Sequence, residues 1–238
     1  SEVLRSTVID LVICMPGNAD NDAFDVARDI KSRFPNIHCV VLTPFSHGIT
    51  KRMENEDLSI FDYVFCWLGN TNLILSIIKL IEDKMNLEHD IQEAGVQMIL
   101  LVEDSIRFYS SILPNLYNYI LEQSKNFSKE ALNRHAATMR MRGRPKVVLA
   151  RTYEEAQKLY DKYSNNTLGV ISDARFPLKS AAKAFGNKVE TEAKPKHRTD
   201  TFGREKCPDA GLQLFRYIRK NDPFVPLILE SSESDNRA

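Results

Sequence analysis

The stretch MILLVEDS (98–105) decides the fold, together with LGVISDARFP (168–177) further along the chain. Each is a largely apolar run that ends in acid. Such runs are typical of strands buried on both faces of a parallel sheet, because nothing inside the sheet solvates a charge. Open α/β sheets bind ligands at the carboxyl ends of their strands, where the chain leaves the core. Glu103, Asp104 and Asp173 are therefore candidates for one shared acidic site.

Outward from these two runs, strand-like and amphipathic helical segments alternate along the chain. This alternation predicts an α/β fold with parallel sheets covered by helices on both faces. The expected strands lie at 8–15, 38–43, 62–67, 98–104, 146–151, 168–173 and 225–231. The expected helices lie at 23–34, 72–85, 106–142, 152–163 and 211–220. Pro114, inside the longest helical stretch, is expected to kink or break it.

The composition narrows the possible functions. A chain of 238 residues is long enough for one or two domains. Its 32 Lys and Arg residues balance 32 Asp and Glu residues, which argues against a dedicated nucleic-acid-binding protein. No apolar run approaches the roughly 20 residues of a membrane helix, and no signal sequence opens the chain. The four cysteines lack the spacing of a zinc site. We expect a soluble, cytoplasmic protein without a membrane or nucleic-acid partner.

The chain contains an internal repeat. AFDVARDIKSRFPNIHCVVLT (23–43) aligns without a gap on GLQLFRYIRKNDPFVPLILES (211–231), and VICM (12–15) aligns on VISD (170–173). The second copy carries a polar, Lys-rich insertion at 179–206, which is expected to be a mobile surface loop.

The two copies differ in chemistry, because Met15 stands where the second copy has Asp173. We therefore expect two domains, residues 1–90 and 95–238, of which the first binds no metal and accepts no phosphoryl group.

The second domain resembles the receiver domain of bacterial response regulators. VEDS (102–105) resembles the acidic pair that follows the first receiver strand, and DARFP (173–177) resembles the phosphoacceptor aspartate with a proline four residues later. Ser231 stands where receivers place the hydroxyl that contacts the phosphoryl group. The resemblance implies a flavodoxin-like sheet of strand order 2-1-3-4-5, of which residues 95–238 lack the last strand.

The first domain resembles the later three strands of a second receiver. Met15 takes the place of the phosphoacceptor, and Cys66 takes that of the usual lysine. The resemblance thus implies two partial receivers joined by a helix.

Three longer phrases carry a narrower resemblance, to the receiver-like region that precedes the catalytic part of bacterial phosphoenolpyruvate synthase-like proteins. They are WLGNTNLILSIIKLIEDKMNLEHD (67–90), ILLVEDSIRFYSSILPNLY (99–117) and MRMRGRPKVVLARTYEEA (139–156). These residues include no ATP-grasp, phosphohistidine or pyruvate-binding segment. We therefore expect no catalysis from this chain by itself and place the phosphotransferase activity in an attached catalytic domain.

The receiver resemblance implies a role for each site residue. Asp173 would be the nucleophile that forms an aspartyl phosphate, and Ser231 would contact the phosphoryl group. Glu103, Asp104 and Asp173 would bind Mg²⁺, and the backbone carbonyl of Arg175 would complete its protein ligands. Without a cation, crowding should raise the pKa of at least one of the three carboxyls. Because the last strand is missing, no lysine is expected beside the phosphoacceptor.

These expectations lead to competing hypotheses. The first is a regulatory phosphoacceptor module, phosphorylated by a histidine kinase or a small phosphodonor. The second is an unphosphorylated receiver pair that serves as a dimerisation scaffold. A metal-dependent phosphohydrolase is a third, although Arg175 rather than a second acid stands two residues after Asp173. Exposed edges at strands 8–15 and 225–231 predict a homo-oligomer.

Overall fold

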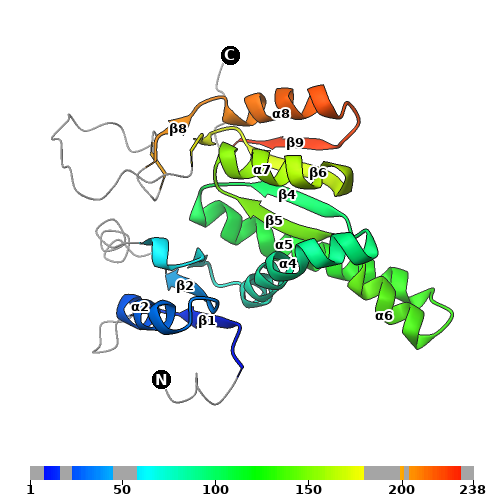
Figure 1. Cartoon of the computed structure of the whole chain (residues 1–238), viewed down its shortest axis with the longest axis horizontal. Coiled ribbons are helices and arrows are strands. Elements are labelled where there is room, and N and C mark those ends of the chain that lie inside the picture. The colour runs from blue at the N-terminus through cyan, green and yellow to red at the C-terminus, as the bar shows by residue number, and fades with distance from the viewer. Residues whose placement is uncertain (1–7, 17–22, 45–57, 180–198, 201–203, 232–238) are drawn as a thin grey trace. The chain divides into compact units, whose positions relative to one another are not determined.

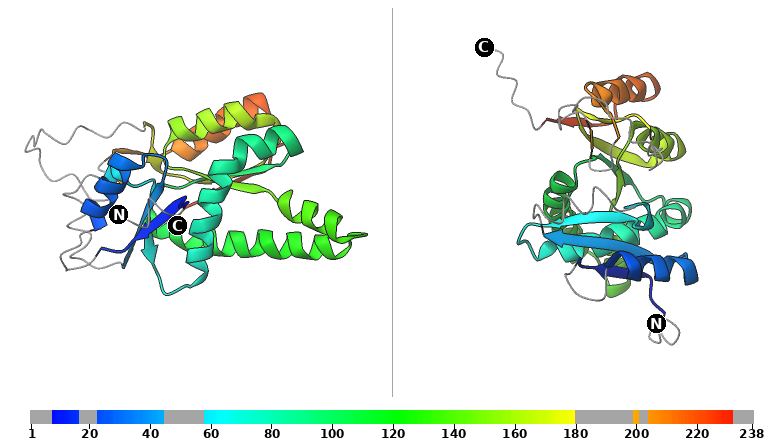
Figure 2. Two further views of the ribbon diagram at one scale, coloured as in Figure 1. Left: turned by 60° about the horizontal axis from the view of Figure 1, so that its bottom comes forward. Right: turned by 90° about the vertical axis from the view of Figure 1, so that its left-hand side faces the viewer.

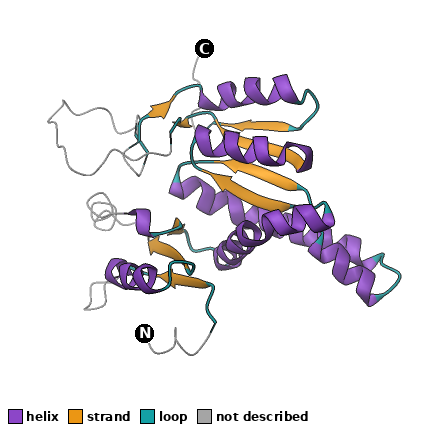
Figure 3. Cartoon of the chain, viewed as in Figure 1, coloured by secondary structure: helices purple, strands orange, loops and turns teal. Residues whose placement is uncertain are grey.

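The structure is a computed structural model, in which strands and helices alternate along the chain (Figures 1 and 3). The described residues are 8–16, 23–44, 58–179, 199–200 and 204–231. All strand pairs in the two larger sheets are parallel, which confirms the predicted α/β class. None of the described helices combines the length and the apolar character needed to cross a membrane.

The contacts within the chain define two units. Unit 1 comprises Ser1–Ile81 and Ile106–Pro114, and unit 2 comprises Glu82–Ser105 and Asn115–Ala238. The divisions fall inside two helices, α4 (Asn72–Ala94) and α5 (Ile106–Lys129).

Unit 1 contains a three-stranded parallel sheet of order β1-β2-β3. Its strands are β1 (Leu11–Cys14), β2 (His38–Pro44) and β3 (Tyr63–Trp67). The helix α2 (Ala23–Arg33) connects β1 to β2, and a short 3₁₀ helix, η1 (Leu58–Ile60), precedes β3. Helical spacing places Phe24, Ala27 and Ile30 on the buried side of α2. The ring of Phe24 meets that of Phe61 edge-on, with 5.5 Å between their centroids.

Unit 2 contains a four-stranded parallel sheet of order β5-β4-β6-β9. Its strands are β4 (Met98–Val102), β5 (Lys146–Ala150), β6 (Thr167–Asp173) and β9 (Leu227–Glu230). Its other helices are α6 (Arg134–Arg142), α7 (Tyr153–Tyr163), the 3₁₀ helix η2 (Ser164–Asn166) and α8 (Ala210–Asn221). A separate antiparallel pair joins β7 (Phe176–Pro177) to β8 (Lys206–Cys207).

Helices cover both faces of this second sheet. Figure 2 shows α7 and α8 on one face and the later part of α5 on the other. On the first face, Leu100 and Val102 of β4 share a buried core with Tyr160 of α7 and Leu214 of α8. Thr152 begins α7, because its hydroxyl accepts a hydrogen bond from the Glu155 backbone N–H at 3.2 Å.

The two copies of the repeat pair their strands in the same register. Val12 of β1 faces Cys39 of β2, and Val170 of β6 faces Leu227 of β9. The sequence alignment matches Val12 with Val170 and Cys39 with Leu227. The repeat is therefore a repeat of structure as well as of sequence.

The long helical stretch departs from the expectation. α5 continues through Pro114 to Lys129, and the break falls before α6 instead. Leu113 beside the proline is buried, so packing holds the helix together although the proline lacks a backbone N–H. Asn133 starts α6 by accepting a hydrogen bond from the Ala136 N–H at 2.8 Å.

The insertion 179–206 is only partly described, since residues 180–198 and 201–203 lie outside the described residues. For its last residues the expectation of a loose loop is wrong. Thr199 forms a β-bridge with Glu205, and Lys206 pairs with Pro177 in the β7–β8 sheet. These pairs satisfy backbone groups that a loose loop would leave to water.

Candidate metal centre

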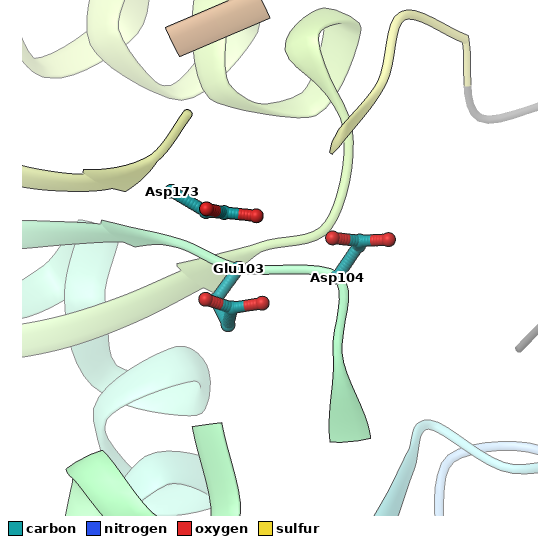
Figure 4. A group of neighbouring side chains, drawn as sticks. All are labelled: Glu103, Asp104 and Asp173. Carbon is teal, nitrogen blue, oxygen red and sulfur yellow. The ribbon is translucent and has the colours of Figure 1, made fainter. Parts of the chain in front are cut away.

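Three acidic side chains meet where β4 and β6 end. The two strands are neighbours, and Val102 pairs with Ser172, so the residues that follow emerge at the same edge of the sheet. Glu103 and Asp104 follow β4, and Asp173 ends β6. One carboxylate oxygen from each lies within 4.8 Å of the others, and Figure 4 shows the three groups gathered beside the strand ends. The predicted proximity is confirmed.

The acidic cluster is buried, which disfavours its charged form. Glu103 is 4% exposed and Asp104 is fully buried, while Asp173 is half-buried. Burial, with the nearby charge of Asp173, raises the pKa of Glu103 to about 8. Burial raises the pKa of Asp104 to about 6 against the opposing charge of Lys206. Burial also raises the pKa of Asp173. A bound cation would remove this penalty.

Backbone groups orient two of the three carboxylates. The Ser105 N–H donates to Glu103 Oε1 at 2.9 Å, and the Ala174 N–H donates to Asp173 Oδ1 at 2.7 Å. The backbone of Arg175 also hydrogen-bonds to the Asp173 carboxyl and lowers its pKa. The local chain at each strand end therefore holds these side chains in place.

Asp104 differs from the other two acids. No described residue donates a hydrogen bond to its buried Oδ1, while its Oδ2 lies 2.7 Å from Lys206 Nζ in an ion pair. Buried polar atoms in folded proteins almost always have partners. An unsatisfied carboxylate oxygen inside a group of three acids fits a site for a hard divalent cation such as Mg²⁺, which prefers oxygen ligands.

Lys206 is the residue that the sequence reasoning missed. We expected no lysine beside the phosphoacceptor, and the ion pair with Asp104 shows that a lysine does reach the acidic cluster. Lys206 comes from the end of the insertion and is positioned by its pairing with Pro177. The sequence carried little signal for this contact, because β8 is two residues long.

Ser231 and Arg175 follow neighbouring strands of the second sheet, β9 and β6, at the edge where the acidic cluster lies. Ser231 directly follows Glu230, which pairs with Asp173 across β6 and β9, and its side chain is exposed. The backbone carbonyl of Arg175 as a metal ligand stays a prediction. In unit 1, Met15 follows β1 at the place matching Asp173 and is 61% exposed, whereas Cys66 is buried within β3.

No family model, curated protein or solved structure matches this chain. What the site can do follows from its own residues. Glu103 and Asp104 supply buried carboxyl oxygens, and Asp173 supplies a carboxyl group that remains partly accessible. Together they can bind a divalent cation beside a potential oxygen nucleophile.

Proposed function

We propose that unit 2 is a receiver-type phosphoacceptor module of a signal-transduction protein. Asp173 accepts a phosphoryl group from a histidine kinase or a small phosphodonor, with Mg²⁺ bound by Glu103, Asp104 and Asp173. The observation that carries the proposal is the group of three carboxylates at two adjacent strand ends, one of which has a buried oxygen without a donor.

The fold of unit 2 supports this proposal. Its strand order β5-β4-β6-β9 matches the first four positions of the flavodoxin-like order 2-1-3-4-5, with the acidic residues at the ends of the first and third strands. Ser231 follows the strand in the fourth position, where a receiver places its phosphoryl-contacting hydroxyl. Met15 in unit 1 offers neither charge nor a nucleophile, so the chemistry belongs to unit 2.

The proposed transfer needs positioning more than covalent assistance. A carboxylate oxygen of Asp173 attacks phosphorus as the bond from phosphorus to the donor breaks, and the donor leaves with that electron pair. The donor atom is a histidine nitrogen of the kinase or an oxygen of a small phosphodonor. The Ala174 N–H holds the attacking carboxylate by its hydrogen bond to Oδ1. Bound Mg²⁺ would neutralise the negative charge of the phosphoryl oxygens and of the acidic cluster. Arg175 stands where a phosphohydrolase would need a second acid, so the site lacks the acid that would assist hydrolysis of the aspartyl phosphate.

The phosphorylated module would act on other domains. We propose that it regulates an attached catalytic region of the phosphoenolpyruvate synthase-like kind, and that this chain has no catalysis of its own. The alternative is a scaffold that is never phosphorylated.

Phosphorylation is testable by intact-mass measurement. The wild-type chain treated with acetyl phosphate and Mg²⁺ should gain one phosphoryl mass, and Asp173→Asn should gain none. Asp25→Asn, on the exposed side of α2, is the matched control and should behave as wild type. An unmodified wild type under conditions where Mg²⁺ binds would favour the scaffold, and an adduct on Asp173→Asn would show that Asp173 is not the acceptor.

A further inference from the structure

Lys206 forms an ion pair with one of the three acids of the proposed metal site. Its Nζ lies 2.7 Å from Oδ2 of the fully buried Asp104, and its own side chain is only 19% exposed. Its positive charge lowers the pKa of Glu103, Asp104 and Asp173 alike. The ammonium is therefore within electrostatic reach of every carboxylate in the cluster.

The backbone fixes Lys206 at this place. Lys206 pairs with Pro177 and Cys207 pairs with Phe176, which is fully buried in the core of unit 2. β7 begins three residues after Asp173, so the strand that holds Lys206 is anchored beside the acid itself. The pairing holds the Lys206 backbone near the cluster, whereas its ammonium stands at the end of a flexible four-carbon side chain.

We infer that the Lys206 ammonium is a built-in competitor of the divalent cation at the acidic cluster. This inference rests on the proposed metal site. A divalent cation bound to Asp104 would lie within a few ångströms of the ammonium, and at such distances the repulsion in a partly buried site is strong. Cation binding therefore requires Lys206 to leave Asp104.

The competition between Lys206 and the divalent cation lowers the affinity of the site for that cation. Without metal, Lys206 compensates part of the buried negative charge, so the cluster can persist in the folded protein. With metal, the lost ion pair weakens the net affinity below that of three carboxylates alone. The site then responds to changes in cation concentration instead of remaining saturated.

Isothermal titration with Mg²⁺ alone tests the inference. The measurement should be made at about pH 9, where most carboxyls are ionised. We expect Lys206→Gln to bind Mg²⁺ at least about tenfold more tightly than wild type, because one positive charge is gone. Lys206→Arg keeps the charge and should bind like wild type. Lys158→Gln removes an exposed lysine on α7 and should change nothing.

A second readout follows the lysine itself. Amine-reactive labelling, quantified by peptide mass spectrometry, should modify Lys206 faster once Mg²⁺ saturates the protein, while Lys158 is modified at an unchanged rate. Equal or weaker Mg²⁺ binding by Lys206→Gln would overturn the inference, as would labelling of Lys206 that Mg²⁺ does not alter.

The outcomes separate this inference from the proposed function. Tighter binding by Lys206→Gln without any phosphorylation of Asp173 would uphold the competition and reject the phosphoacceptor role. Phosphorylation of Asp173 with unchanged Mg²⁺ affinity in Lys206→Gln would do the opposite. Absence of Mg²⁺ binding in every variant would reject both.

Discussion

Glu103 makes the stability of the metal-free protein depend on pH. Its pKa in the folded state is about 8, against an ordinary value of 4.5. Between these values the folded state holds a proton that the unfolded state releases, so stability falls as pH rises through this window. Each pKa unit corresponds to about 1.4 kcal/mol, so the fall should amount to a few kcal/mol.

Urea unfolding in EDTA at several pH values measures this effect. We expect the midpoint to drop between pH 4.5 and 8. Glu103→Gln should reduce this drop and leave the part that the raised pKa values of Asp104 and Asp173 cause. Glu122→Gln, exposed on α5, should leave the dependence unchanged. A wild type that becomes more stable across this window would contradict the raised pKa.

Asp83 anchors a second buried charge group, in unit 2. Its carboxylate accepts hydrogen bonds from Arg144 at 2.6 and 3.1 Å, from the Tyr117 hydroxyl at 2.9 Å and from the Val147 N–H at 2.9 Å. Lys146 Nζ lies 3.8 Å from Asp83 Oδ1. Asp83→Ala leaves Arg144 buried without this counter-charge and should cost about 3–5 kcal/mol of unfolding free energy.

The exposed pair of Glu154 and Lys158 on α7 provides the comparison for Asp83. Glu154→Ala should cost at most about 1 kcal/mol in the same denaturant titration. Equal losses of unfolding free energy in Asp83→Ala and Glu154→Ala would show that burial does not decide how much the Asp83 group contributes to stability.

Sequence reasoning found the acids but not their cationic partners. Glu103 and Asp173 stood out because each ends an apolar run, and parallel strands bring such ends together. Lys206 and Arg144 meet their acids through contacts between distant parts of the chain, and nothing in local periodicity reports such contacts. Asp83 looked like one more polar residue of a helix.

At the scale of elements, α8 approaches the end of β6 too closely for a side chain. A Cβ on Gly211 would lie 2.3 Å from the Asp173 carbonyl oxygen and 2.8 Å from Leu229 Cδ1. Gly211→Ala should therefore displace the start of α8 or the end of β6. We expect a loss of about 1–3 kcal/mol in stability, and weaker Mg²⁺ binding because Asp173 moves.

Denaturant titration and isothermal titration test both effects of Gly211→Ala. Leu212→Ala, at a partly exposed position one residue further along α8, is the control and should affect neither greatly. Unchanged stability and Mg²⁺ affinity in Gly211→Ala would mean that α8 can shift to make room for the added methyl group without a loss of stability.

Helix and strand positions were largely predictable, whereas one helix break was not. Strands such as β4 and β5 are buried at nearly every residue, so their apolar runs mark them clearly. The break after Lys129 was missed because Pro114 is the stronger local signal. Tertiary packing overrode that signal at Leu113, and the cap at Asn133 set the actual boundary.

At the scale of the whole molecule, the edge strand β9 predicts self-association. Among the described residues β9 pairs only with β6. Ile228 is 54% exposed, and Phe224 just before the strand is 89% exposed. Unpaired apolar edges tend to recruit another strand, so we expect a concentration-dependent oligomer in multi-angle light scattering.

Charge at the β9 edge should oppose that association. Ile228→Lys should shift the protein toward monomer, whereas Lys220→Glu, exposed on α8, should not. A wild-type protein that is monomeric at every concentration would contradict the predicted self-association.

The equivalent strands of the two units pair in the same register, which makes exchange of segments between the units possible. Because Val12 faces Cys39 as Val170 faces Leu227, a segment of one unit can replace its counterpart without turning side chains from core to solvent. The loops after β1 and β6 differ by about 30 residues, yet lengthening a loop adds little closure entropy. The two strand–helix–strand segments are thus interchangeable parts, and only the second ends its first strand in an acid, Asp173.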